Sequence, residues 1–107
     1  MHQLFELAEL QARQAAGDRR YLEFLRVPSL STGLYVLPAG DTDPQQPHAA
    51  DEIYYIISGR ARFTVAEDDY LVQAGSVIYV SAQVPHRFHS IEADLTILVL
   101  FAPPEPR

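Results

Sequence analysis

Side chains that can bind a metal ion are concentrated in two segments of this 107-residue chain. The first segment carries Gln46, His48 and Glu52, and the second carries His86. A site that combines His48 with a second imidazole of the other segment can form only if the fold brings these two segments together. The spacing of these residues therefore makes a prediction about the fold as well as about chemistry.

Two imidazoles and a carboxylate are ligands that suit a divalent ion of hard-to-borderline character, and a set of three leaves coordination positions open. Residues of equal parity share one face of a strand. Gln46, His48, Glu52 and Tyr54 would therefore point the same way if the intervening turn adds no odd residue. Tyr54 is expected to line the barrel, either as a core-packing residue or, as the best candidate for a residue next to the ligands, with its hydroxyl holding a metal-bound water or a substrate oxygen. Open positions would make the site catalytic rather than structural.

Two alternatives bear on this interpretation. Residues four apart, like His48 and Glu52, could also occupy one turn of a helix, but Pro47 and the Ile- and Tyr-rich run that follows favour a loop leading into a strand. His86 taken alone would be an ordinary histidine after a turn. His89 has the opposite parity to His86, so we expect it to face outward.

Composition excludes several classes of function. The net charge is −6 with only eight Lys and Arg residues, which opposes the phosphate-neutralising surface of a nucleic-acid-binding protein. No apolar run reaches the ~18 residues that a membrane span needs, and the N-terminal segment is acidic, unlike a signal peptide. We therefore predict a cytoplasmic protein without nucleic-acid or membrane partners. Because the chain has no cysteine, a metal site can use only imidazole, carboxylate and amide ligands.

The N-terminal region has the spacing of a helix, and the rest of the chain has the pattern of short strands. Apolar residues recur at helical intervals over about residues 3–16, and Gly17 follows. From about residue 20 to 102 there are about eight short stretches typical of strands, and we expect Gly59 to end one of them. The stretch 60–65 alternates, so its even-numbered residues should face water. This pattern predicts an all-β sandwich or barrel in a single domain of residues 1–107.

Two further segments, residues 38–44 and 95–101, indicate a loop and a strand with no exposed polar face. Residues 38–44 have the composition of a solvated loop, and its aspartates lack the spacing of a calcium loop. The last strand, residues 95–101, is apolar on both faces, so it is either central or covered by a helix or another subunit. With an N-terminal segment that could pair across subunits, this favours a homodimer.

The motif residues resemble those of the cupins, a family of small β-barrel proteins. The first cupin motif has a glycine, two histidines, a glutamate and a second glycine. In this chain Gly40, Gln46, His48, Glu52 and Gly59 occupy its spacing, with Gln46 in place of the first histidine.

The second cupin motif is matched less completely. Gly75 and His86 fit its glycine and histidine, whereas Ser81, Gln83 and Ser90 depart from its Pro, Gly and Asn. The resemblance covers roughly residues 21–101, which is nearly all of the strand region.

The resemblance implies a cupin-type β-barrel, a double-stranded β-helix or jelly roll, with a short N-terminal helix. It also implies a metal inside the barrel, bound by His48, Glu52 and His86. Some cupin isomerases that act on sugar phosphates are similar in having Gln with zinc at the position of Gln46, so the Gln46 amide oxygen could complete the ligand set; otherwise water fills that position.

The functional expectation is a metal-dependent enzyme acting on a small molecule. With Fe(II) the site would support an oxygenase reaction; with Zn or Mn it would support isomerisation or hydrolysis. Nickel is a further candidate, since the sequence does not name the ion. The alternatives are a non-enzymatic cupin that binds or senses a small molecule, and a metal-free structural barrel.

Overall fold

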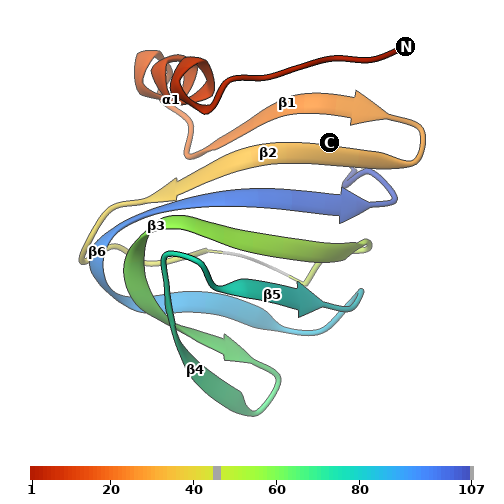
Figure 1. The fold of residues 1–107 in the computed structure, drawn as a ribbon. Helices are drawn as coiled ribbons and strands as arrows, with labels where there is room; N and C mark the ends of the chain where they lie inside the picture. Colours follow the sequence, from red (N-terminus) through yellow and green to blue (C-terminus); the bar gives the residue numbers. More distant parts are fainter. Residues whose placement is uncertain (45–46, 107) are drawn as a thin grey trace.

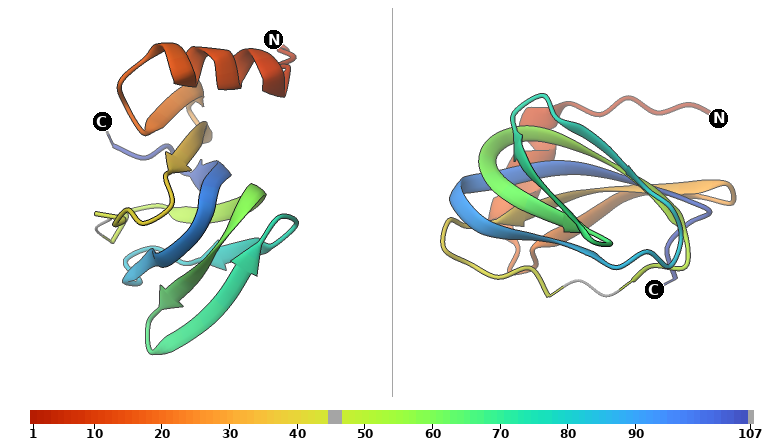
Figure 2. Two further views of the ribbon diagram at one scale, coloured as in Figure 1. Left: turned by 90° about the vertical axis from the view of Figure 1, so that its left-hand side faces the viewer. Right: turned by 90° about the horizontal axis from the view of Figure 1, so that it is seen from below.

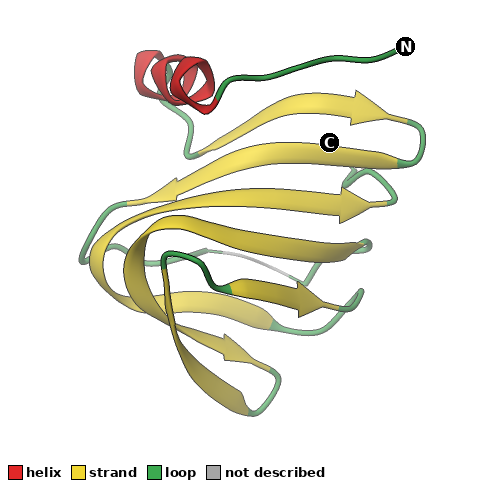
Figure 3. Cartoon of the chain, viewed as in Figure 1, coloured by secondary structure: helices red, strands yellow, loops and turns green. Residues whose placement is uncertain are grey.

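The computed structural model describes residues 1–44 and 47–106. It consists of one helix and six strands (Figures 1 and 3). In chain order these are α1 (Leu7–Ala16), β1 (Tyr21–Val27), β2 (Leu30–Leu37), β3 (Asp51–Val65), β4 (Asp68–Gln73), β5 (Val77–Val80) and β6 (His86–Ala102). The predicted all-β fold with a short N-terminal helix is confirmed.

Strands β3 and β6 are the longest, and each contributes to two sheets. The first half of β3 and the second half of β6 pair with each other and form one antiparallel sheet in the order β1-β2-β6-β3-β5. The second half of β3 lies between β4 and the first half of β6 in the other sheet. The two sheets face each other, and α1 crosses the β1–β2 end of the first sheet (Figures 1 and 2). The two shared strands thus make one closed sandwich.

Gly59 lies at the corner where β3 bends from one sheet into the other. The register between β3 and β6 shifts three times between Ile56 and Arg62, which is the pattern of bulges that bend a strand. Gly59 has φ 103°, and a Cβ there would overlap the backbone of Asp94. The expectation that Gly59 ends a strand is therefore wrong: glycine lets the strand continue through the corner. The six observed strands are fewer than the predicted eight because β3 and β6 are long and continuous.

The core lies between the two sheets and is formed by the inward residues of both. Along β3, Ala61 and Phe63 are fully buried and Arg60 and Arg62 are exposed, as the alternation predicted. The largest fully buried side chains are Tyr54, Phe63, Phe88, Leu34, Leu37, Ile56, Leu95 and Ile97. Aromatic rings of β3 and β6 pack against each other near the first half of β6, with the Phe63 and Phe88 centroids 4.6 Å apart.

The N-terminal helix is shorter than the sequence predicts. It begins at Leu7 rather than near residue 3, and Glu6 before it is extended, with φ −98° and ψ 130°. Phe5 packs edge-on against Phe24 of β1 at 4.8 Å, so the contact with the sheet holds the preceding segment out of the helix. No helix in the described part of the chain is long and apolar enough to cross a membrane.

The loop after β2 is anchored inside the protein and is not fully solvated as expected. The carboxylate of Asp43 is buried and accepts hydrogen bonds from the Tyr35 hydroxyl at 2.7 Å and from the Phe88 backbone N–H at 2.9 Å. A buried carboxylate needs such donors. Asp43 therefore ties the loop to β2 and β6 next to the metal-capable residues.

Strand β6 is central, between β2 and β3, which is one of the two arrangements that its apolar sequence predicted. The exposed apolar side chains include four on the outer faces of β3 and β5: Ile53, Tyr55, Val77 and Tyr79. Ile53 is paired with Tyr79 and Tyr55 with Val77 across the two strands.

Candidate metal centre

Glu52 and His86 meet inside the barrel because β3 and β6 bend from one sheet into the other, which places the start of β3 and the start of β6 on facing sheets. Glu52 is the second residue of β3, on its inward face, and His86 is the first residue of β6. The Glu52 Oε1 and His86 Nε2 atoms are 2.6 Å apart, and both side chains are only 1% exposed. A buried carboxylate and imidazole at this distance form a hydrogen-bonded ion pair when the imidazole is protonated.

His48 completes the group from the loop that leads into β3. Its backbone carbonyl accepts a hydrogen bond from the Gln83 N–H at 2.8 Å. Its Nε2 is 4.0 Å from Glu52 Oε1, and its ring centroid is 5.3 Å from that of His86. One ligand atom from each of the three residues lies within 4.8 Å of the other two. The structure thus brings together His48, Glu52 and His86, while Gln46 lies outside the described residues.

The orientation of His86 is fixed by hydrogen bonds at both ring nitrogens. Nδ1 lies 2.8 Å from the Val84 carbonyl oxygen, to which it can only donate, so in the neutral ring Nε2 carries the lone pair. Nε2 faces Glu52 and lies 2.9 Å from the Tyr54 hydroxyl. Burial disfavours the charged ring, but the hydrogen bond to Glu52 and that to Val84 outweigh it and raise the pKa of His86.

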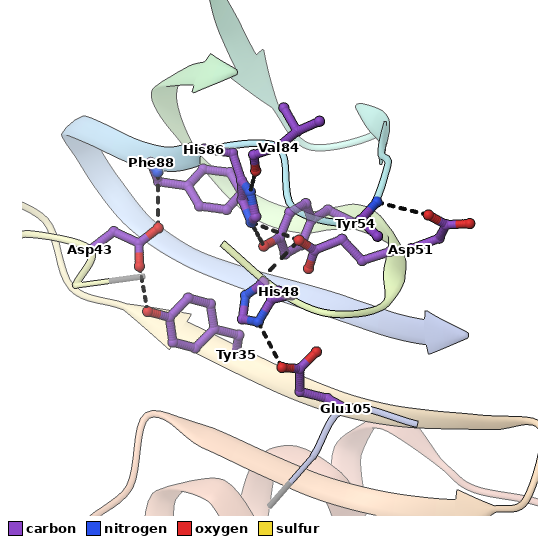
Figure 4. A network of polar contacts seen from close by, with 11 residues as sticks. Tyr35, Asp43, His48, Asp51, Tyr54, Val84, His86, Phe88 and Glu105 are labelled. Atoms are coloured by element: carbon purple, nitrogen blue, oxygen red, sulfur yellow. Dashed lines mark hydrogen bonds and ion pairs between the residues drawn. The ribbon is translucent and has the colours of Figure 1, made fainter. Parts of the chain in front are cut away.

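The outer nitrogen of His48 is paired with a second carboxylate, that of Glu105. The His48 Nδ1 and Glu105 Oε1 atoms are 3.1 Å apart. Figure 4 shows His48 between Glu105, which follows β6, and the His86 and Tyr54 side chains. A carboxylate on the outer nitrogen is the arrangement that fixes the tautomer and the direction of a metal-binding histidine.

The three residues fit a divalent ion. Ligand atoms about 2.0–2.2 Å from one ion stand about 3.0–3.5 Å from each other, and the distances here bracket that range. Among the described residues Glu52 Oε2 is buried and has no hydrogen-bond partner. An unpaired carboxylate oxygen beside two imidazoles is costly without a cation, and this orphaned atom is what a bound ion would satisfy.

A cavity of about 240 Å³ opens beside the group. Its lining residues come from four strands, the loop before β3 and the C-terminal tail: Tyr21, Tyr35, His48, Tyr54, Val99, Phe101 and Glu105. Burial, and then the hydrogen bond to Asp43, raises the pKa of Tyr35, so this phenol stays protonated at neutral pH. A small molecule in the cavity would touch His48 and Tyr54 at one end and aromatic walls elsewhere.

The cavity and its surroundings include residues that the sequence singled out and others that it did not. Tyr54 lines the cavity beside His86, as expected, and His89 faces the other side of β6, where its Nε2 lies 2.6 Å from the Asp69 carboxylate. Tyr21 and Glu105 were missed as lining residues. Glu105 follows two prolines that mark the end of regular structure, and no local pattern distinguishes it from a solvated tail residue.

A match to a family profile over most of the strand region identifies the family. The sequence profile of the Cupin domain matches residues 33–101. This chain belongs to the cupin family. The cupin is 54% identical over 101 residues to an uncharacterized protein of Streptomyces coelicolor, a match that covers 94% of this chain and 96% of that protein.

Solved structures show the same fold. TT1209 from Thermus thermophilus superposes with a TM-score of 0.73 at 22% identity, over 94% of this cupin and 97% of that chain. A DMSP lyase from Ruegeria pomeroyi superposes with a TM-score of 0.69 at 24% identity, over 78% of this cupin and 47% of that chain. The predicted cupin-type barrel is confirmed, and at this level of identity the likeness concerns the fold alone.

Proposed function

We propose that this cupin binds a divalent metal ion through His48, Glu52 and His86 and is an oxygenase-type enzyme acting on a small molecule. The observation that carries the proposal is the convergence of two imidazoles and one carboxylate within 4.8 Å at the wall of a cavity. This is the ligand set of non-haem Fe(II) oxygenases. When bound, the ion would supply Lewis acidity and, as iron, redox chemistry toward dioxygen.

The residues of the chain have distinct tasks in this proposal. His86 is held by Val84, so that its Nε2 faces inward, and Glu105 orients His48 from outside. The Tyr54 hydroxyl, 2.9 Å from His86 Nε2, is placed to donate a hydrogen bond to a substrate oxygen. Apolar walls keep water from the reacting end of the substrate.

The lining of the cavity argues against a phosphorylated substrate. Among the described residues that line it there is no Lys or Arg, and the charged side chain besides histidine is the acidic Glu105. A sugar-phosphate isomerase needs cationic groups for its phosphate. The cavity therefore favours an uncharged or weakly charged small molecule over a sugar phosphate.

The test combines metal analysis with oxygen uptake. Protein from metal-controlled growth should contain or accept one equivalent of metal, and with Fe(II) it should consume oxygen in the presence of small cyclic substrates. A chelator or His86→Ala should abolish metal binding. His89→Ala is the matched control, because this histidine lies on the opposite face of β6, and it should leave binding unchanged.

Two other outcomes would change the assignment. Metal binding together with turnover that consumes no oxygen would favour a metal-dependent isomerase or hydrolase. Stoichiometric ligand binding without turnover would favour a sensing or storage role. Metal binding that survives His86→Ala would refute the proposed ligand set.

We further propose that the cupin is a homodimer. Support comes from the exposed apolar side chains of Ile53, Tyr55, Val77 and Tyr79, which form one cross-strand group on the outer faces of β3 and β5. Covering such a group is favourable. Sedimentation at micromolar concentration should give a dimer, and a monomer there would refute the proposal.

A further inference from the structure

Two side chains that line the cavity each contain a buried polar atom whose hydrogen-bonding capacity is unused within the described residues. Among the described residues, neither the Tyr21 hydroxyl nor Glu105 Oε2 has a hydrogen-bond partner. Both side chains line the cavity. Leaving a buried polar group unsatisfied costs about 1–3 kcal/mol, so each such group in a folded protein calls for an explanation.

Glu105 is fixed in place by contacts along its whole length. Its backbone N–H donates to Ser31 Oγ at 3.2 Å, and its carbonyl oxygen accepts from Arg26 Nη1 at 2.8 Å. Its Oε1 contacts His48 Nδ1 at 3.1 Å. These three contacts leave Oε2 as the part of the carboxylate that can accept a further hydrogen bond at the cavity.

Tyr21 is held by its neighbours in the sheet. Its ring contacts Tyr35 and Phe101 edge-on, each with centroids 6.3 Å apart. It also lies over Gly33, where any Cβ would overlap the Tyr21 ring. The absence of a side chain at Gly33 therefore makes room for this tyrosine. Burial, and then the nearby carboxylates of Glu23 and Glu105, raise the pKa of Tyr21, so its hydroxyl remains a donor at neutral pH.

A donor and a nearby acceptor on the wall of one cavity match one kind of ligand group. A hydroxyl can accept from the Tyr21 phenol and donate to the Glu105 carboxylate at once. The remaining walls are aromatic or aliphatic, and about 240 Å³ exceeds the ~150 Å³ cavity that holds benzene. We propose that the ligand is a small hydroxylated ring compound whose hydroxyl binds Tyr21 and Glu105.

This inference relies on the proposed function only for the location of the site, and it can be tested without metal. Phenol and toluene differ by a hydroxyl in place of a methyl group. Their binding to the full chain can be followed by NMR titration of ¹⁵N- and ¹³C-labelled protein, both metal-free and zinc-loaded. Although toluene is more apolar, we expect phenol to bind at least about tenfold more tightly, because the site is built to hydrogen-bond a hydroxyl.

Three variants test the assignment of residues. Tyr21→Phe and Glu105→Ala should each abolish the preference for phenol, and Gly33→Ala should weaken it by displacing the Tyr21 ring. Tyr21→Phe should leave the melting temperature unchanged or raise it, because it removes an unsatisfied buried hydroxyl. A residue with only a structural role would not give this combination. Tyr79→Phe, at an exposed tyrosine of β5, is the control and should retain the preference.

Other results would overturn the inference. They are binding of toluene as tight as that of phenol, a phenol preference that survives both Tyr21→Phe and Glu105→Ala, and failure of both compounds to bind up to their solubility limits. Zinc binding is measured separately in the same samples. A protein that prefers phenol but binds no zinc would refute the proposed metal centre while supporting the hydroxyl site.

Discussion

Replacing each of the two site carboxylates by its amide should distinguish a metal ligand from a residue that orients a ligand. Glu52 Oε1 lies 2.6 Å from His86 Nε2, and Glu105 Oε1 lies 3.1 Å from His48 Nδ1. Gln keeps the shape of Glu and one acceptor oxygen but removes the charge. Glu52→Gln and Glu105→Gln are therefore the same chemical change made once at a proposed ligand and once at a proposed orienting residue.

The expected magnitudes follow from the two positions. Loss of a carboxylate on the outer nitrogen of a ligating histidine typically lowers metal affinity 10–100-fold, so we expect this range for Glu105→Gln. Glu52→Gln removes the only anionic ligand of the three, and we expect a loss beyond about 100-fold. Without metal it should also cost about 1–2 kcal/mol, because a charge-assisted hydrogen bond becomes a neutral one.

Zinc titration calorimetry and urea unfolding with chelator present measure the two effects. Equal loss of zinc affinity in both variants would contradict the distinction between ligand and orienting residue. Zinc binding like that of the original protein in Glu52→Gln would refute the assignment of Glu52 as a ligand. Unchanged stability of the metal-free variant would refute the reasoning from the buried pair.

Three other measurements test how His86, Tyr35 and Gly59 contribute to the stability of the fold. The folded-state pKa of His86 is raised above 6.5. Its protonation therefore contributes to the stability of the metal-free fold fully below about pH 6.5, and this stabilisation is lost as the pH rises through the folded pKa. Thermal unfolding with chelator present should show the decline in stability, and His86→Ala should make stability less dependent on pH. Tyr35→Phe removes a hydrogen bond to the buried Asp43 carboxylate and should lower the free energy of unfolding by about 1.5–3 kcal/mol in urea; no change would contradict that role. Gly59→Ala should lower the free energy of unfolding more than Gly75→Ala, because both glycines have positive φ but only a Cβ at Gly59 overlaps backbone atoms. The strained φ alone costs about 1–3 kcal/mol in each variant. Equal losses of stability would mean that the overlap at the corner does not matter.

Local patterns were sufficient to predict the all-β class and the inward faces of the residues around the candidate site. The parity of Glu52 and Tyr54 follows directly from strand geometry, and both are buried on the inward face. The spacing of His48 and His86 from the family motifs added the second imidazole. These features could be predicted because they depend on short segments with fixed repeat distances.

Features that depend on the path of the chain through space could not be predicted in this way. Whether Gly59 ends a strand or bends it is decided by how closely Asp94 approaches, and Asp94 is far away in the sequence. The burial of Asp43 depends on donors from Tyr35 and Phe88, which belong to two different strands. Glu105 reaches His48 only because the tail after β6 returns past β2.

The sharing of β3 and β6 between both sheets restricts how a molecule can enter the barrel. Opening the sandwich like two hinged plates would disrupt the pairing of β3 with β6, which runs from Asp51–Ala102 through the register shifts to Val65–His86. Entry at an end of the barrel would leave this pairing intact. Tyr21 and Glu105 also border a second hollow on their outer side, of about 560 Å³, together with Arg19, Leu22, Glu23 and Pro106. The two residues that we assign to ligand recognition thus border both hollows, so their substitution should be tested for an effect on the rate of ligand exchange as well as on affinity.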